Sequence, residues 1–188
     1  MSKSNGRNNH RRSGGKSANF GLYVVLVVVA LAVAVTVYAW RSGQKGGAVV
    51  GKQAPDITVR DLQGNAVKLS SIHQPVLVTF WQTTCPACQA EFVTLQDLWT
   101  EANKSGGPQW TLMLVDLGES ADTVKAFMAE HNYNLPVYLD SSGAAGDAYG
   151  VYYIPANFFL DRTHKITYKN EGGLPGPEFK KRLDSLTK

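Results

Sequence analysis

An uncharged run over residues 20–40, rich in Val, Ala and Leu, constrains this chain more than any other feature. A helix needs about 20 apolar residues to cross a bilayer, and a helix that is apolar on every face is seldom part of a soluble core. The run ends with Tyr38 and Trp40, aromatic residues typical of the membrane boundary. We therefore predict a transmembrane signal anchor over residues 20–40. A cleaved signal peptide is the alternative, which Ala32 and Ala34 would permit, although its apolar core is usually shorter.

The basic residues around this run predict its orientation. Five Lys or Arg residues precede it, and only Arg41 and Lys45 follow it closely. Because basic residues favour the cytoplasmic side, residues 1–19 are expected to be a disordered cytoplasmic tail. Residues 41–50 are glycine-rich and are predicted to be a flexible linker. Residues 51–188 then form a domain outside the cytoplasm, periplasmic or extracytoplasmic, held by one span in a bacterial inner membrane.

The distribution of charge argues against nucleic-acid binding. The formal net charge is +4, but no Asp or Glu precedes Asp56. The remainder of the chain carries eleven basic and fifteen acidic residues. The exported domain is therefore mildly acidic, and the sequence predicts no nucleic-acid partner.

The hydrophobic pattern of residues 51–188 predicts one α/β domain that opens with a hairpin. Short runs rich in β-branched residues indicate strands, and apolar residues at helical spacing indicate helices. Alternating strands and helices imply a mostly parallel sheet, with an antiparallel hairpin near the end. The expected strands are 57–59, a partner reached through the turn at 62–67, and 75–81, 110–117, 135–139, 156–160 and 165–169. The expected helices run from Pro86 to near Ser105 and over residues 121–131 and 178–186.

The only two cysteines of the chain lie in Cys85-Pro86-Ala87-Cys88, between a predicted strand and a predicted helix. Free N–H groups and the dipole at a helix N-terminus favour the thiolate, so Cys85 is the expected nucleophile. Cys88 lies one turn later and is the expected resolving thiol. Pro86 suits the first helical position. The predicted redox group is thus the Cys85–Cys88 disulfide, without a further cofactor.

Two other interpretations of the cysteine pair are a metal site and a purely structural disulfide. A structural zinc site normally needs four ligands, and no second cysteine pair is present. The four histidines are scattered singly, at His10, His73, His131 and His164. A disulfide that closes so short a loop adds little stability. We therefore predict no metal and favour a redox-active pair.

Several segments together resemble a known family. They are Gly51–Asp56, Asp61–Gly64 and Pro75–Trp81, followed directly by the cysteine pair. In this order they resemble the exported thioredoxin-like proteins of the TlpA/ResA type, which overlap with the redoxin and alkyl hydroperoxide reductase superfamily. The likeness extends roughly over residues 51–186. It implies a thioredoxin-like fold, with a mixed central sheet flanked by helices and an N-terminal hairpin.

The same resemblance implies further site residues. In that family a cis-proline loop faces the cysteines and pairs with substrate backbone, and Ile154 and Pro155 match it. Glu91 matches a glutamate that modulates the thiols in some members, with a solvated helix residue as the alternative. Two positions depart from related patterns. Thr79 stands where cytoplasmic thioredoxins carry a buried Asp, and Thr84 stands where most relatives have Trp.

The function implied by the resemblance is thiol-disulfide exchange on exported proteins. Most such proteins are reductases, for example of apocytochromes in cytochrome c maturation, fed by a membrane thiol-disulfide electron donor. A disulfide oxidase is an alternative, because Pro directly after the first cysteine also occurs in oxidising thioredoxin-fold proteins. Val78 and Gln82 replace the Pro and Thr expected of a peroxidase. A non-enzymatic copper or haem chaperone is the remaining alternative, although no Met or His lies beside the pair.

Overall fold

The computed structural model describes residues 18–42, 47–104 and 107–187. The chain divides into two compact units, residues 1–43 and 44–188. The predicted cytoplasmic tail therefore lies outside the described residues except for its last two positions. The middle of the predicted linker, residues 43–46, also lies outside them.

The first unit contains a helix, α1 (Ala18–Ser42), at the uncharged run. The side chains of residues 21–37 are all exposed, and most of them are apolar. Within the residues that the structure describes, no helix combines the length and the apolar character required to cross a membrane. The predicted helix is present, whereas its membrane crossing stays a prediction.

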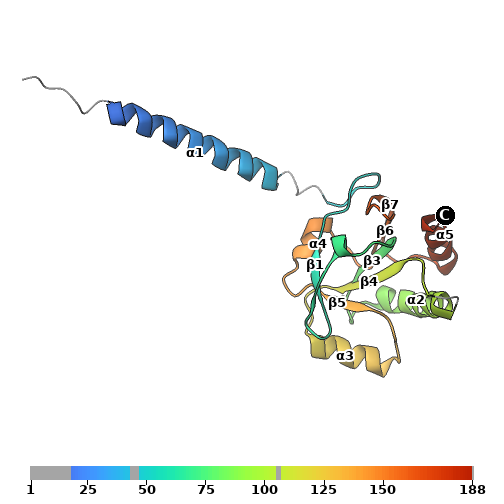
Figure 1. The fold of residues 1–188 in the computed structure, drawn as a ribbon. Helices are drawn as coiled ribbons and strands as arrows, with labels where there is room; N and C mark the ends of the chain where they lie inside the picture. Colours follow the sequence, from blue (N-terminus) through green and yellow to red (C-terminus); the bar gives the residue numbers. More distant parts are fainter. Residues whose placement is uncertain (1–17, 43–46, 105–106, 188) are drawn as a thin grey trace, which may run out of the picture. The chain divides into compact units, whose positions relative to one another are not determined.

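The second unit is built around a seven-stranded sheet with the order β2-β1-β5-β4-β3-β6-β7 (Figure 1). Only β3 with β4 and β4 with β5 pair in parallel. The other neighbours are antiparallel, so the expectation of a mostly parallel sheet was wrong and the mixed sheet is confirmed. Hairpins pair β1 with β2 and β6 with β7, because short turns can join only antiparallel strands. In addition, β1 lies antiparallel to β5 and β6 lies antiparallel to β3. The strands are β1 (Thr58–Asp61), β2 (Ala66–Lys68), β3 (Val76–Trp81), β4 (Thr111–Asp116), β5 (Val137–Leu139), β6 (Ala156–Leu160) and β7 (Ile166–Glu171).

Helices pack on both faces of this sheet. One face is covered by α2 (Pro86–Lys104), α3 (Ala121–Glu130) and α5 (Gly176–Leu186). The other face is covered by α4 (Ala144–Tyr149) and the segment before β1, and a short 3-10 helix spans Leu69–Ser71. Helix α4 was not predicted from the sequence, because a six-residue helix is too short to show an apolar period.

The central strand β3 is buried along its whole length, as predicted. Its side chains alternate between the two faces, so Leu77 and Trp81 join the core beneath α2 while Val78 joins the opposite core. The Trp81 ring centroid lies 4.4 Å from that of Phe92 on α2. Trp81 is therefore a core residue, as the sequence indicated. This packing fixes the C-terminal end of β3, from which the cysteine segment leaves the sheet.

The folded unit begins earlier than the predicted boundary at residue 51. Ala48 is buried, and its N–H donates to Tyr149 O at 2.9 Å. A Cβ atom at Gly47 would lie only 2.9 Å from the same carbonyl oxygen, so this close approach requires glycine. Residues 47–50 therefore belong to the domain rather than to the linker.

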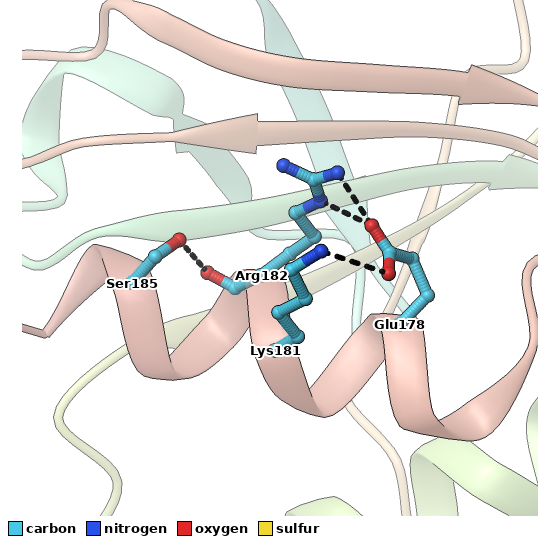
Figure 2. A network of polar contacts seen from close by, with 4 residues as sticks. All are labelled: Glu178, Lys181, Arg182 and Ser185. Carbon is cyan, nitrogen blue, oxygen red and sulfur yellow. Dashed lines mark hydrogen bonds and ion pairs between the residues drawn. The ribbon is translucent and has the colours of Figure 1, made fainter.

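Four residues of the C-terminal helix α5 form a network of polar contacts (Figure 2). Arg182 places its guanidinium carbon 3.8 Å from the ring centroid of Tyr168 on β7. Its Nε donates to Glu178 at 2.7 Å, and Lys181 lies 3.6 Å from the same carboxylate. The Ser185 hydroxyl donates to Arg182 O at 2.7 Å. The cation–π contact joins helix and strand. The bond with Glu178 orients the guanidinium, and the remaining contacts lie within α5.

Candidate active site

The cysteine pair lies where α2 begins, directly after the loop that follows β3. Cys85 and Cys88 form a disulfide. Cys85 is partly exposed, whereas Cys88 is fully buried, and the Cys88 N–H lies 3.2 Å from Cys85 Sγ. Pro86 and Ala87 between them are exposed. Of the two sulfurs, that of Cys85 is thus the one presented to the surface.

The loop before β6 faces this disulfide. The Ile154–Pro155 peptide bond is cis, and Ile154 O lies 3.8 Å from Cys85 Sγ. Pro155 is buried, while Tyr152 and Tyr153 just before it are 86% and 72% exposed. The structure therefore brings both residues of the expected cis-proline loop to the cysteines, with two exposed aromatic rings beside them.

Glu91 lies one turn after Cys88 on the inner side of α2. It is only 4% exposed, so the alternative of a solvated helix residue was wrong. Asn157 Nδ2 donates to its two oxygens at 3.0 and 3.2 Å, and Leu174 N donates to Oε1 at 2.6 Å. Burial raises the pKa of Glu91 to about 7, although these donors act in the opposite direction. A buried carboxyl group with a raised pKa thus lies on α2 one turn after Cys88.

Thr79 and Asn157 orient this carboxyl group. The Thr79 hydroxyl donates to Asn157 Oδ1 at 2.7 Å, and both residues are fully buried on adjacent strands. Because the carbonyl oxygen of Asn157 faces Thr79, its amide nitrogen faces Glu91. Thr79 does not itself replace a buried Asp. The buried acid that contacts Asn157 comes instead from α2.

A second acidic group contacts the loop before Cys85. Glu119 accepts from Thr83 N and from Thr83 Oγ1, both at 2.6 Å. Gln89 Nε2 on α2 donates to Thr83 O at 2.7 Å. Thr83 is thereby held from two sides, while the neighbouring Thr84 is exposed to solvent.

Asp116 lies behind Glu119 at the end of β4 and is fully buried. Its Oδ1 accepts from Glu119 N at 2.8 Å. Burial, a side-chain hydrogen bond to Glu119 and the charges of Glu119 and Asp140 raise the pKa of Asp116 to about 8. Partial burial would raise the pKa of Glu119 as well. Hydrogen bonds with Asp116 and Thr83 outweigh this effect and hold the pKa of Glu119 below its ordinary value.

Sequence reasoning missed Thr83, Asp116, Glu119 and Asn157 as residues near the cysteines. One signal was present for Asp116, because an acidic residue ends a strand that is otherwise apolar. Parallel neighbouring strands end at the same edge of a sheet, so this acid had to lie near the end of β3. No comparable signal pointed to Asn157, whose role depends on the antiparallel return of β6.

The reactive group that this site contains is the Cys85–Cys88 disulfide. Among the described residues, no group of three or more His, Cys, Asp or Glu side chains is arranged to hold a metal ion. The chemistry open to this arrangement is exchange at Cys85 Sγ, with one buried carboxyl group on α2 and another at the end of β4.

Comparisons with known proteins agree with this geometry. A family model described as the AhpC/TSA family matches residues 50–169. Thiol-disulfide oxidoreductase ResA of Bacillus cereus is 26% identical over 165 residues, covering 87% of this chain and 94% of that protein. ResA of Geobacillus thermodenitrificans is 27% identical over 164 residues, covering 87% of this chain and 92% of that protein.

Solved structures show the same fold. The thioredoxin domain of a thiol-disulfide oxidoreductase from Bacteroides vulgatus matches with a TM-score of 0.63 at 23% identity, covering 76% of this chain and 100% of that one. StoA from Bacillus subtilis matches with a TM-score of 0.59 at 21% identity, covering 70% of this chain and 98% of that one. The second unit therefore has the thioredoxin-like fold that the sequence predicted.

Proposed function

Because this chain belongs to the AhpC/TSA family, we propose that it is a thiol-disulfide oxidoreductase of the ResA type, with Cys85 and Cys88 as its reacting residues. The observation that carries the proposal is the disulfide at the start of α2, with Ile154 O 3.8 Å from Cys85 Sγ. Cys85 is partly exposed and Cys88 is buried. This suits a pair in which Cys85 reacts with the substrate and Cys88 resolves the mixed disulfide.

The reaction follows from these positions. In the reduced protein the Cys85 thiolate attacks a substrate disulfide, forms a mixed disulfide and releases one substrate thiolate. The Cys88 thiol then loses its proton and attacks Cys85 Sγ, which releases the second substrate thiolate and restores the Cys85–Cys88 disulfide. Two electrons pass to the substrate. The backbone of Ile154 and Pro155 would hold the substrate chain, while Pro86 and Glu91 adjust the thiols.

The proposed direction is reduction of exported proteins, with the haem-binding cysteines of apocytochromes c as one example. The resemblance of the sequence to reductases of this kind supports it. The dithiol must be regenerated by a donor that brings two electrons from the membrane, namely a membrane thiol-disulfide exchanger. No organic cofactor or metal enters this scheme.

The proposed location is the outer side of a bacterial inner membrane, with residues 20–40 as a single-pass anchor. The uncharged sequence of this run and the exposed apolar side chains of α1 support the anchor. The excess of basic residues before the run supports the orientation.

The first test is the reduction potential of the Cys85–Cys88 pair, measured in thiol buffers of defined potential on residues 44–188. A value near that of thioredoxin, about −270 mV, would support a reductase. A value near −120 mV would favour an oxidase of exported proteins. Failure to form the disulfide reversibly would contradict both roles and leave the metal or haem chaperone.

The second test assigns the two cysteines. We expect Cys88→Ser to accumulate mixed disulfides between Cys85 and its substrates, because the resolving step is lost. Cys85→Ser is the matched control and should trap nothing. Equal trapping by the two variants would contradict the assigned order of attack.

A further inference from the structure

We propose that Asp116 and Glu119 share one proton and position Cys85, by holding Thr83 and the loop that leads into α2. The inference rests on the proposed function, in that Cys85 is taken as the attacking thiol. The two acids act through Thr83 and are positioning residues, without contact to substrate in the proposed scheme.

The geometry begins with the parallel pairing of β3 and β4. Trp81, the last residue of β3, is the register partner of Asp116, the last residue of β4. The loops that follow therefore leave the same edge of the sheet together. Two hydrogen bonds join them, Leu117 N to Trp81 O at 3.1 Å and Gln82 Nε2 to Leu117 O at 2.7 Å.

Glu119 is the strongest link between these two loops. Each of its oxygens receives a separate donor from Thr83, at 2.6 Å from the backbone N–H and at 2.6 Å from the hydroxyl. Hydrogen bonds to an ionised acceptor are about twice as strong as neutral ones. Thr83 lies two residues before Cys85, and Cys85 N donates to Gln82 O at 3.2 Å. A shift of Thr83 would therefore move the start of α2.

Asp116 supplies the proton. Its Oδ2 is buried and accepts no hydrogen bond from an N–H or O–H group of the described residues. An ionised oxygen in such a place is costly. A protonated carboxyl group would instead donate to the carboxylate of Glu119, whose backbone N–H already donates to Asp116 Oδ1. One proton shared by Asp116 and Glu119 thus accounts both for the unpartnered Oδ2 and for the closeness of two carboxyl groups.

The surroundings of the pair add negative charge and no compensating cation. Asp140 at the end of β5 faces Asp116, and its own Oδ2 accepts from Ala145 N and Gly146 N at 2.9 Å each. Within the described part of the chain, none of these three acids has an ion-pair partner. Loss of the shared proton would leave three carboxylates close together. Their repulsion would weaken the hold of Glu119 on Thr83.

The test uses the full chain in detergent micelles with its cysteines reduced. The rate of reaction with a small disulfide, oxidised glutathione, is measured from pH 7 to 9.5 and divided by the thiolate fraction of Cys85. We expect this corrected rate to fall about three- to tenfold as the pair loses its proton, the range that a lost hydrogen bond corresponds to. Asp116→Asn keeps a neutral donor at this position and should remove the fall.

A second measurement follows the carboxyl groups directly. With ¹³C-labelled aspartate, NMR should show one aspartate carboxyl group whose pKa lies well above the ordinary range. The titration of this group should be missing from the spectra of Asp116→Asn. Glu119→Gln should move this titration to lower pH, because it removes the neighbouring negative charge. Asp122→Asn, at an exposed position at the start of α3, is the control and should change neither the rate profile nor the titration of Asp116.

Two results would overturn the inference. One is an Asp116 that titrates in the ordinary range, and the other is an alkaline fall in rate that persists in Asp116→Asn. Failure of the proposed function gives a different pattern, because the cysteines would then not exchange at any pH while the NMR titration would still report the acid pair.

Discussion

At the scale of single residues, two buried acids are linked to different parts of the segment that carries the cysteines. Glu91 is on the side of Cys88 and is held by Asn157 and Leu174 N. Asp116 is on the side of the loop before Cys85 and acts through Glu119. Both acids have raised pKa values because of burial. Two carboxyl groups whose pKa values are raised by burial therefore belong to the segments that hold the cysteines in place.

The role of Glu91 is tested by Glu91→Gln. When Glu91 ionises, its negative charge disfavours a thiolate at Cys88, one turn away. The substitution should therefore lower the pKa of the Cys88 thiol, by roughly 0.5–1 unit, and remove a titration near pH 7. The thiolate absorbance of the reduced protein, followed against pH, measures both effects. Asp97→Asn, exposed on the same helix, is the control, and an unchanged thiol titration in Glu91→Gln would show a purely structural residue.

At the scale of elements, the site depends on three neighbouring strands whose ends meet. β3 supplies the cysteine loop, β4 supplies Asp116, and β6 begins with the loop of Pro155. α5 contributes at a distance, because it covers the same core as α2 and is fixed to β7 through Arg182 and Tyr168.

The docking of α5 is tested by Arg182→Ala. Loss of the cation–π contact and of the buried stem of this side chain should lower the midpoint of thermal unfolding by about 2–4 °C. Lys180→Ala is the matched control on the same helix. Its ion pair with Asp184 joins side chains that are 59% and 57% exposed, so no measurable change is expected. Equal effects of the two substitutions would contradict the assigned role of the contact with Tyr168.

At the scale of the whole molecule, the raised pKa values of the two buried acids predict how stability depends on pH. Between the ordinary carboxyl range and pH 7–8, the folded state binds more protons at Glu91 and Asp116 than the unfolded state does. Their contribution to the free energy of unfolding is therefore complete at about pH 4 and is lost as the pH rises through 7 and 8.

Urea unfolding of the oxidised protein at pH 5 and pH 9 measures this loss. We expect a decrease of more than about 1 kcal/mol in the free energy of unfolding. The double variant Glu91→Gln, Asp116→Asn should flatten the profile, whereas Asp122→Asn should leave it unchanged. A stability that rises between pH 5 and pH 9 in the unsubstituted protein would contradict the prediction.

The division into two units predicts how the chain distributes in a cell. The full chain should sediment with bacterial membranes and resist extraction by high salt, because residues 20–40 would be inserted in lipid. Residues 44–188, exported with a separate cleavable signal, should stay in the soluble fraction and keep the redox-active disulfide. A full chain recovered in the soluble fraction would contradict the anchor.

Sequence alone was sufficient for features that depend on local pattern. The buried strand β3, the helix that starts at the cysteines, the two hairpins and the pairing of Cys85 with Cys88 all follow from short-range periodicity and spacing. The cis-proline loop followed from a resemblance of contiguous residues, and the cis peptide bond is present. The short α4 and the start of the domain at residues 47–50 escaped this approach, because their contacts come from distant segments.

Only the tertiary structure decided which polar residues surround the disulfide. The sequence is compatible with either a solvated or a buried Glu91. Asn157 contacts Glu91 because β6 returns antiparallel beside β3. Asp116 became a neighbour of the cysteine loop because β4 pairs in parallel with β3. The physical reason is that the pKa of a carboxyl group depends on burial and on donors from other strands, and neither is encoded in the residues next to it.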